Sequence, residues 1–473
     1  MISEYPVYTM LMQLKKDNLL PALLFRTSRR QCDDDIEKLS MRTSAELPLE
    51  NQELIKAEVE KIIEKYQMER EVIYGHQQYE ALVKTGAGAH HAGQLLLWRL
   101  LLEELMGRGM LRLMIATGTV AAGVDFPART TIITAHSKRG AEGFKILTSS
   151  EFQQMSGRAG RRGKDSVGIC LIAPGLFSDA RVVSEIIKKP VEPLRSAYFA
   201  APSTVLNLLK FRQVEDLRFL VEKSFAGFLD RKEADKLEKE VRVLQSEYDK
   251  KKDDFQKEQA KKFKKKINRR QKEVEMLKNR QSMQLENTIR ALESLGHIKD
   301  NKLTQKGHWA AELCTSLVLE LAEAIDSGLF EDLDTYELVG LVASIAGDSY
   351  RTYVDIRKNP VKKQYFDEMT RIVEYVKLAY ENKNREEVAV QPSAAITVTT
   401  WMDSQDWASF SSILRLAGVA EGDASRLISQ TADHLNQISR LEETFPELAT
   451  QALEARNILL RPPLLENIAK DLR

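Results

Sequence analysis

Three arginines lie close together in the segment "EFQQMSGRAGRRGKD", residues 151–165. Arg158 and Arg161 are three residues apart, so on a helix they would share a face. Guanidinium groups keep their charge and bind phosphate oxygens through two parallel hydrogen bonds. In phosphoryl transfer, such arginines neutralise the charge that develops on the γ-phosphate. Gln154 precedes Arg158 by one helical turn and would orient a water molecule, so these three residues form the candidate catalytic set.

Two glycines between the arginines, Gly157 and Gly160, allow the backbone to approach a ligand closely. The simpler alternative is a solvated basic helix that binds only the backbone of a nucleic acid. A complete nucleotide site also needs a phosphate-binding loop and a magnesium ligand. The sequence contains no GxxxxGK[ST] motif, and the acidic pair in "FDEM" (366–369) follows no strand pattern. We therefore expect no ATP hydrolysis by this chain alone.

Composition places few limits on function. The chain has 473 residues and a formal net charge of +1, so a polyanion must be bound by local basic clusters. Its three cysteines are far apart, which disfavours a zinc site and favours a reducing, cytoplasmic compartment, with the nucleus as the alternative. No apolar run is long enough to span a membrane, and the N-terminus lacks the pattern of a secretion signal. We expect no membrane partner and no metal centre in the protein itself.

Residues 1–175 alternate between apolar runs and amphipathic helical patterns. The runs at 21–25, 111–117, 130–135 and 167–173 predict buried parallel strands. Between them, "QLLLWRLLLEELM" (94–106) predicts a helix. This alternation is typical of an α/β domain with a parallel sheet.

Strand patterns nearly vanish beyond residue 175. Residues 228–295 contain no glycine or proline, and Leu237, Val241, Leu244 and Tyr248 keep the spacing of a coiled-coil seam. The seam weakens around 251–262, which predicts two antiparallel helices with a tip there; one continuous helix is the alternative. The run 251–280 carries about eight excess positive charges, either on a solvated arm or on an arm that binds nucleic acid.

The segment 292–313 predicts a helix, a small hairpin with its turn at Asp300–Asn301, and a second helix. The remainder, 309–473, has helical periodicity throughout. Its two tryptophans, Trp401 and Trp407, either pack in the core or stack on bases. Core packing is the expectation for both rings, and for Phe25 in the first predicted strand.

Several of these segments together resemble the second RecA-like domain of superfamily 2 helicases. "IATGTVAAGVDFPA" (115–128) resembles motif V of that family, and "QMSGRAGRRG" (154–163) resembles motif VI. "LLFRTSRR" (23–30) resembles motif IV, and "HHAG" (90–93) resembles the adjoining nucleic-acid contact. The order and spacing of the four segments match the family.

Later segments narrow the resemblance to the superkiller-type DExH helicases, which feed RNA to the exosome. "VLNLL", "KSFAGF" and "GHIKDNKLTQKGHWA" resemble their winged helix, and 329–348 and 418–438 resemble their helical ratchet domain. Their stalk carries a globular head, for which this chain has no room. The resemblance implies a second RecA-like domain (1–175), a winged-helix region in two parts (176–230 and 291–315), an antiparallel stalk (231–290) and a ratchet-like bundle (316–473).

The resemblance also implies roles for individual residues. Arg158 and Arg161 would be arginine fingers, and Gln154 would contact the γ-phosphate or the attacking water. A second set would bind the nucleotide and couple it to the strand: Gly123, Asp125 and Gly157. A third set would contact the nucleic-acid strand: Ser28, Arg29, His91, Gly93, Thr117 and Thr119. The alternatives are ordinary capping after a β-strand for Thr117 and Thr119, and a tight turn between strand and helix for His91 and Gly93. For Ser28 and Arg29 the alternative is a solvated position at the start of a helix.

The sequence thus predicts the C-terminal part of an ATP-dependent helicase that moves 3′ to 5′, a polarity that the resemblance alone implies. ATP and Mg²⁺ would be bound mainly by a first RecA-like domain that this sequence does not contain. The expected partners are that domain, a single strand of nucleic acid and a protein on the stalk. Arg162 and the inserted stalk favour RNA over DNA. The competing hypothesis is a non-catalytic nucleic-acid-binding scaffold with a degenerate helicase half.

Overall fold

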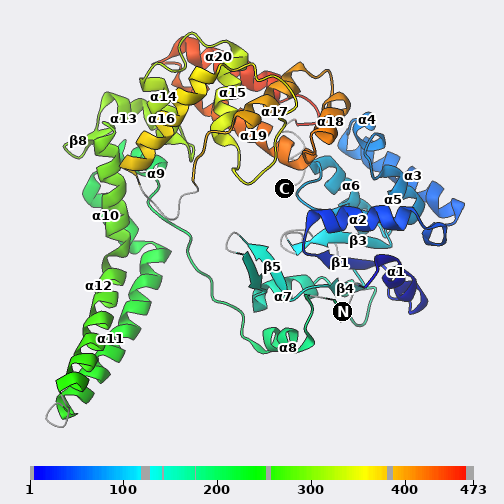
Figure 1. The fold of residues 1–473 in the computed structure, drawn as a ribbon, viewed down its shortest axis with the longest axis horizontal. Helices are drawn as coiled ribbons and strands as arrows, with labels where there is room; N and C mark the ends of the chain where they lie inside the picture. The colour runs from blue at the N-terminus through cyan, green and yellow to red at the C-terminus, as the bar shows by residue number, and fades with distance from the viewer. Residues whose placement is uncertain are drawn as a thin grey trace.

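Strands and helices alternate in the first part of the chain, and helices dominate the rest (Figure 1). The computed structural model describes residues 5–118, 128–140, 143–175, 177–251, 257–380 and 387–464. No helix in these ranges combines the length and the apolar composition needed to cross a membrane.

Five parallel strands form one sheet, in the order β2-β3-β1-β4-β7: β1 (Ala22–Arg26), β2 (Ala87–His90), β3 (Leu113–Thr117), β4 (Thr130–Ile133) and β7 (Ile169–Ile172). Four of them coincide with the predicted apolar runs, so that prediction is confirmed. Strand β2 was not predicted, because "AGAH" consists mostly of small residues and resembles a loop. The side chain of Leu102 fills the space above Gly88, where a Cβ atom would lie only 2.5 Å from it.

Eight helices flank this sheet: α1 (Val7–Lys16), α2 (Arg29–Ser40), α3 (Leu49–Tyr66), α4 (Arg70–Tyr74), α5 (Tyr79–Thr85), α6 (Leu96–Gly107), α7 (Ser149–Ser156) and α8 (Ala180–Lys188). Both faces of the sheet are covered, because alternate residues of a strand point to opposite sides. Leu24 of β1 packs with α1 and α2, whereas Phe25 packs in a separate core with α6 and α7. Helix α6 confirms the helix predicted at 94–106, and Phe25 is a core residue as expected.

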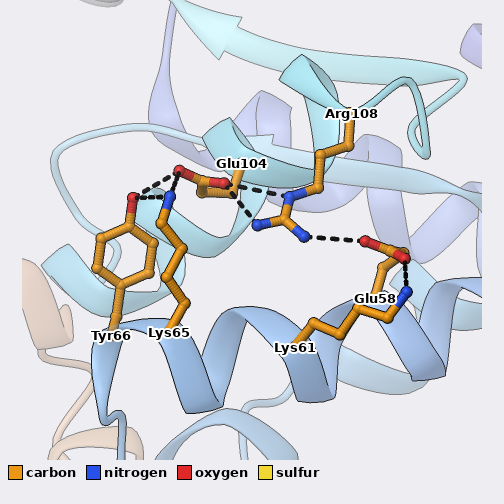
Figure 2. Close-up of polar contacts among 6 residues, drawn as sticks. All are labelled: Glu58, Lys61, Lys65, Tyr66, Glu104 and Arg108. Atoms are coloured by element: carbon orange, nitrogen blue, oxygen red, sulfur yellow. Dashed lines mark hydrogen bonds and ion pairs between the residues drawn. The ribbon is translucent and has the colours of Figure 1, made fainter.

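A network of charged side chains joins α3 to α6 (Figure 2). Glu104 of α6 accepts hydrogen bonds from Lys65 at 3.0 Å and from Tyr66 at 2.5 Å. Arg108 bridges Glu104 and Glu58 at 3.0 and 2.9 Å. Although burial opposes ionisation, the hydrogen bonds to the Glu104 carboxylate lower its pKa to about 2. The network therefore depends on an ionised carboxylate at its centre.

An extended connection leads from α8 to α9 (Pro202–Leu209), α10 (Val214–Lys223) and a long arm (Figure 1). The arm consists of α11 (Phe225–Lys251) and α12 (Lys257–Ser294), which run antiparallel. Asp230 contacts Arg280 at 2.8 Å near the base, and Tyr248 stacks on Phe263 near the far end. Two helices, not one continuous helix, therefore form the arm. Of the predicted tip at 251–262, residues 257–262 belong to α12, and 252–256 lie outside the described residues.

A two-stranded hairpin follows the arm, made of β8 (Ile298–Lys299) and β9 (Lys302–Leu303), before α13 (Gln305–Ala310). Its turn residues, Asp300 and Asn301, have φ angles of 50° and 61°. Such left-handed conformations are what a two-residue hairpin turn requires. The predicted position of the turn is confirmed.

The remaining helices form a bundle: α14 (Val318–Asp326), α15 (Thr335–Ala346), α16 (Lys363–Ala379), α17 (Pro392–Asp403), α18 (Trp407–Leu416), α19 (Glu421–Ile438) and α20 (Pro446–Leu459). Helices α15, α17, α19 and α20 pack against one another at its centre. Trp401 and Trp407 lie in this core, with exposed fractions of 0% and 2%, and both rings contact Phe410. Both tryptophans are too deeply buried to stack on bases, so the expectation of core packing is confirmed.

Candidate functional site

The arginine-rich segment forms a turn after α7, not a continuation of that helix. Helix α7 begins with a capping box between Thr148 and Glu151 and ends at Ser156. Gly160 then adopts a φ of 92°, and a Cβ atom there would lie 3.0 Å from the Cα atom of Gly168. The expectation that Arg158 and Arg161 share a helical face is therefore wrong, because the helix ends at Ser156, with Gly157 as its C-cap, before either arginine.

Asp165 provides the negative charge among these arginines. The Arg161 guanidinium donates from Nε and Nη2 to the Asp165 carboxylate at 2.8 and 3.0 Å. The Arg161 backbone N–H donates to the same carboxylate at 3.0 Å, and Arg129 lies 3.9 Å away. These interactions, with the Arg161 hydrogen bond foremost, lower the pKa of Asp165 to about 2. Sequence analysis did not identify Asp165, although its place four residues after Arg161 was a usable signal.

Arg161 nevertheless keeps donors for a ligand. A guanidinium has five N–H donors in a planar fork, and the Asp165 contacts occupy only the edge formed by Nε and Nη2. Its Nη1 makes no hydrogen bond with any described residue, and 24% of the side chain is exposed. Asp165 thus fixes the direction of the guanidinium and leaves one of its edges open. Arg162 beside it is exposed.

The two segments that resemble motifs V and VI touch through their backbones. The Ala128 N–H donates to the Arg158 carbonyl at 3.0 Å, and the Gly160 N–H donates to the Ala128 carbonyl at 2.7 Å. Ala128 is the last residue of "IATGTVAAGVDFPA". Its predicted site residues, Thr119, Gly123 and Asp125, lie outside the described residues. Of this segment, it is Ala128 that pairs with the arginine turn.

A separate pocket of about 280 Å³ lies where β1, β3 and β4 end. The carboxyl ends of parallel strands are where α/β domains commonly bind ligands. Thr27, Thr117 and Gln154 line this pocket, together with Lys138, which is paired with Glu151. Gln154 is exposed and makes no hydrogen bond with another described residue, so its amide is available to a ligand.

Neither Arg158 nor Arg161 lines this pocket. The predicted catalytic set is therefore divided: Gln154 faces the carboxyl ends of the strands, whereas the arginine turn pairs with Ala128, before β4 begins. Small-molecule sites usually enclose about 300–1,000 Å³, so this pocket suits part of a ligand, such as one sugar-phosphate unit.

An antiparallel hairpin, β5 (Ser137–Gly140) and β6 (Gly143–Ile146), begins at the rim of this pocket. Its second strand exposes Phe144 and Ile146, and the ring of Phe144 stacks on Phe177. Exposed aromatic rings are platforms on which bases can stack. Sequence analysis missed this hairpin, because its short strands carry no alternating pattern.

Four of the residues predicted to contact a nucleic-acid strand lie together where the bundle meets the α/β domain. Each of them contacts another residue of the protein. Ser28 caps α2 by accepting the Gln31 N–H at 3.2 Å. The other three form contacts with Asp33 or with the start of α19: Arg29 to Asp423 at 2.7 Å, His91 to Asp33 at 3.0 Å, and the Gly93 carbonyl to the Gly422 N–H at 2.9 Å.

This geometry favours structural roles for at least part of the set. The His91 ring is 3% exposed, so it is not presented to a strand at the surface. The Arg29 guanidinium faces the bundle, and Gly422, which has no Cβ atom, leaves room for the close approach of the backbone at Gly93. The partners on α19 are more than 300 residues away in the sequence, which explains why no local pattern indicated them.

Comparison with known proteins finds one matching domain family and several similar helicases. Residues 300–466 match the DSHCT (NUC185) domain family. The chain is 32% identical over 270 residues to the chloroplastic DExH-box ATP-dependent RNA helicase DExH15 of Arabidopsis thaliana. The alignment covers 50% of this chain and 22% of the relative. It is 29% identical over 225 residues to the human exosome RNA helicase MTR4. That alignment covers 47% of this chain and 21% of the relative.

The chain is thus similar to DExH-box RNA helicases over about half of its own length. A third match, to the ATP-dependent RNA helicase mtr4 of Schizosaccharomyces pombe, is 30% identical over 249 residues. These matches confirm the resemblance to the superkiller-like DExH helicases. Each alignment covers about a fifth of the relative's length, so the chain corresponds to only a part of such a helicase.

Proposed function

We propose that this DExH-helicase relative forms the second motor domain and the helical half of an ATP-dependent RNA helicase. The observation that supports this function is the backbone pairing of Ala128 with Arg158 and Gly160. This pairing joins the segment that resembles motif V to the turn that carries the arginines. A movement of one segment is therefore transmitted to the other.

In this proposal, Arg158 and Arg161 complete a triphosphate pocket whose phosphate-binding loop belongs to another domain. ATP and Mg²⁺ are held mainly by that domain, because this sequence contains no GxxxxGK[ST] motif. Asp165 keeps the Arg161 guanidinium in a fixed direction, and the open Nη1 edge reaches the γ-phosphate. A pre-oriented charge of this kind stabilises the transition state without reorganisation during the reaction.

In the same proposal, the nucleic-acid strand is bound in the pocket at the carboxyl ends of β1, β3 and β4, and not at the arginine turn. Thr117, Gln154 and Lys138 offer neutral and cationic donors for one sugar-phosphate unit, and Phe144 offers a ring for a neighbouring base. The substrate is a single strand of RNA that moves 3′ to 5′, a polarity carried over from the helicase resemblance. In this arrangement Gln154 acts on the strand, not on the attacking water.

The test is ATP hydrolysis in a motor assembled by joining an ATP-binding RecA-like domain of a relative to the N-terminus of this chain. Single-stranded RNA should stimulate hydrolysis more than single-stranded DNA does. Arg161→Ala should reduce the rate by about 10³-fold or more and leave RNA binding unchanged. Arg181→Ala, an exposed arginine on α8, is the matched control and should change neither quantity. Turnover by the 473-residue chain alone would contradict the proposed division of the nucleotide site.

One observation favours a non-catalytic scaffold as the second candidate. Asp165 already balances the charge of Arg161, so the turn is stable without a nucleotide. A scaffold would bind RNA equally well with Arg161→Ala and would gain no ATPase activity from a joined RecA-like domain. The same assembled motor therefore separates the two functions.

A further inference from the structure

The outer face of the arm carries an unbalanced array of cations. Residues 259–272 of α12 contain eight lysines and arginines and no acidic residue. The facing helix is different, because residues 231–251 of α11 contain seven basic and six acidic residues. Charged residues of both signs would keep the arm soluble, so solubility alone does not explain why one segment of α12 carries only positive charge.

Six of these cations have no counterion within the described part of the chain: Lys261, Lys262, Lys265, Lys266, Arg269 and Lys272. All six are exposed. Their neighbours nearer the base behave differently, since Arg270 pairs with Glu273, Lys278 with Glu238 and Arg280 with Asp230. Among the described residues of α12, cations without a counterion are thus concentrated between 261 and 272.

The array lies on one side of the helix. Ile267 and Val274 are buried on the side that faces α11, whereas Lys261, Lys265 and Lys272 line an open groove of about 1020 Å³ on the other side. Several of the six stand four residues apart, as Lys261 and Lys265 do. Like charges at that spacing destabilise a helix unless an external anion neutralises them.

The chemistry of the face selects the form of the anion. The groove is lined by lysines, one arginine, Asn268 and Met276, together with Ala260, Tyr248 and Glu273. Glu273 is paired with Arg270, and the ring of Tyr248 is half-buried and not open for base stacking. The ring of Tyr248 stacks on Phe263 and lies beneath the ammonium of Lys264. Single-stranded RNA is held mainly through stacked bases, whereas double-stranded RNA is held through its phosphates and its shape. The array from 261 to 272 is about 17 Å long, which corresponds to about five phosphates of one strand.

We propose that the outer face of α12 is a second RNA site, which binds the phosphate backbone of double-helical RNA without reading its sequence. The choice of RNA among polyanions rests on the proposed function. The arm extends away from the α/β domain (Figure 1), so the site holds a duplex outside the path of the translocating strand. Nothing in the binding requires ATP.

The experiment compares two variants of the whole chain with equal change in net charge. In one, Lys261, Lys265, Arg269 and Lys272 are replaced by Gln; in the control, Lys232, Lys236, Lys239 and Arg242 of α11 are replaced by Gln. Binding of a blunt RNA duplex of about 20 base pairs and of single-stranded RNA of equal length is measured by fluorescence anisotropy over a salt series.

The α12 variant should bind the duplex at least about tenfold more weakly, and its plot of log K against log salt should be flatter by about three to four units of slope. The α11 control should change duplex affinity by less than about twofold, and neither variant should alter single-strand binding by more than that. A charge-preserving variant with Arg at the three lysines should keep the wild-type slope, which separates loss of charge from loss of the helix.

Equal duplex binding by the two Gln variants would overturn the proposal, as would a wild-type chain that does not bind the duplex. A loss confined to single-stranded RNA would also overturn it. Each of these results would leave the ATPase test of the assembled motor unaffected, so failure of the arm site is distinguishable from failure of the helicase function.

Discussion

The Arg161 guanidinium lies against the carboxylate of Asp165, with Nε and Nη2 at 2.8 and 3.0 Å from its two oxygens. Because the Asp165 side chain is only 4% exposed, the pair directs Arg161 from within the turn. The cluster of arginines therefore does not need a bound phosphate to be stable. It leaves one guanidinium edge open, which the proposed role of Arg161 as an arginine finger requires.

Asp165→Asn tests whether Asp165 positions Arg161. The amide keeps the shape of the carboxylate but weakens the hold on the guanidinium, so ATP hydrolysis by the assembled motor should fall by about tenfold, less than for Arg161→Ala. The measurement is the steady-state rate at saturating RNA, with RNA affinity recorded in parallel. An Asp165→Asn rate as low as that of Arg161→Ala would show that Asp165 does more than orient its neighbour.

Gly422→Ala should separate the helical bundle from the α/β domain. A Cβ atom at this position would lie 2.3 Å from the Ala92 carbonyl oxygen and 2.6 Å from that of Gln94, and neither backbone atom can move aside easily. We expect a loss of about 1–3 kcal/mol at this interface, seen as faster proteolysis between the two parts. Gly107→Ala is the control, because a Cβ atom there meets nothing within 4 Å. Equal proteolysis of the two variants would contradict the prediction.

The Arg29–Asp423 ion pair should contribute measurably to the same interface. The two side chains are 27% and 12% exposed, so the pair is less screened than a surface pair. A double-mutant cycle with alanine at both positions should give a coupling free energy of about 1 kcal/mol. The exposed pair Arg30–Asp34, at 3.8 Å, provides the comparison and should give a value near zero. Similar couplings for the two pairs would mean that Arg29 does not anchor the bundle.

Glu104→Gln should make the contact between α3 and α6 dependent on pH. The folded-state pKa of Glu104 is about 2, below its ordinary value of 4.5, so its contribution is complete above about pH 4.5 and is lost as the pH falls towards 2. After discount for solvent screening, the variant should lose about 1 kcal/mol at pH 7. Its difference from the wild type should close as the pH falls through that window.

Hydrogen exchange of the α3 amides measures this effect locally. Glu53→Gln is the control, because Glu53 is exposed and its ion pair, with Lys56, lies within its own helix. A Glu104→Gln difference that persists unchanged at pH 3 would show that packing, and not the ionised carboxylate, holds the two helices together.

Local patterns were sufficient for much of the fold. Apolar runs indicated four of the five sheet strands, and an uninterrupted polar stretch with a spaced seam indicated the arm. The turn at Asp300–Asn301 followed from residue type, since both residues tolerate a left-handed backbone. Such features depend on neighbours within a few residues, so they can be recognised without knowledge of the rest of the chain. Strand β2 escaped this kind of reasoning, because its burial depends on Leu102 from another element.

The sequence by itself determined which residue types were available for phosphate chemistry: the arginines, Gln154 and Thr117. Only the tertiary structure decided how they are distributed, with Gln154 and Thr117 in one pocket and the arginines in a turn beside Ala128. Folding also gave Arg29 and Gly93 partners on α19, more than 300 residues away. The physical reason is that a side chain's role depends on what packs against it, and contacts between distant segments leave no periodic pattern in the sequence.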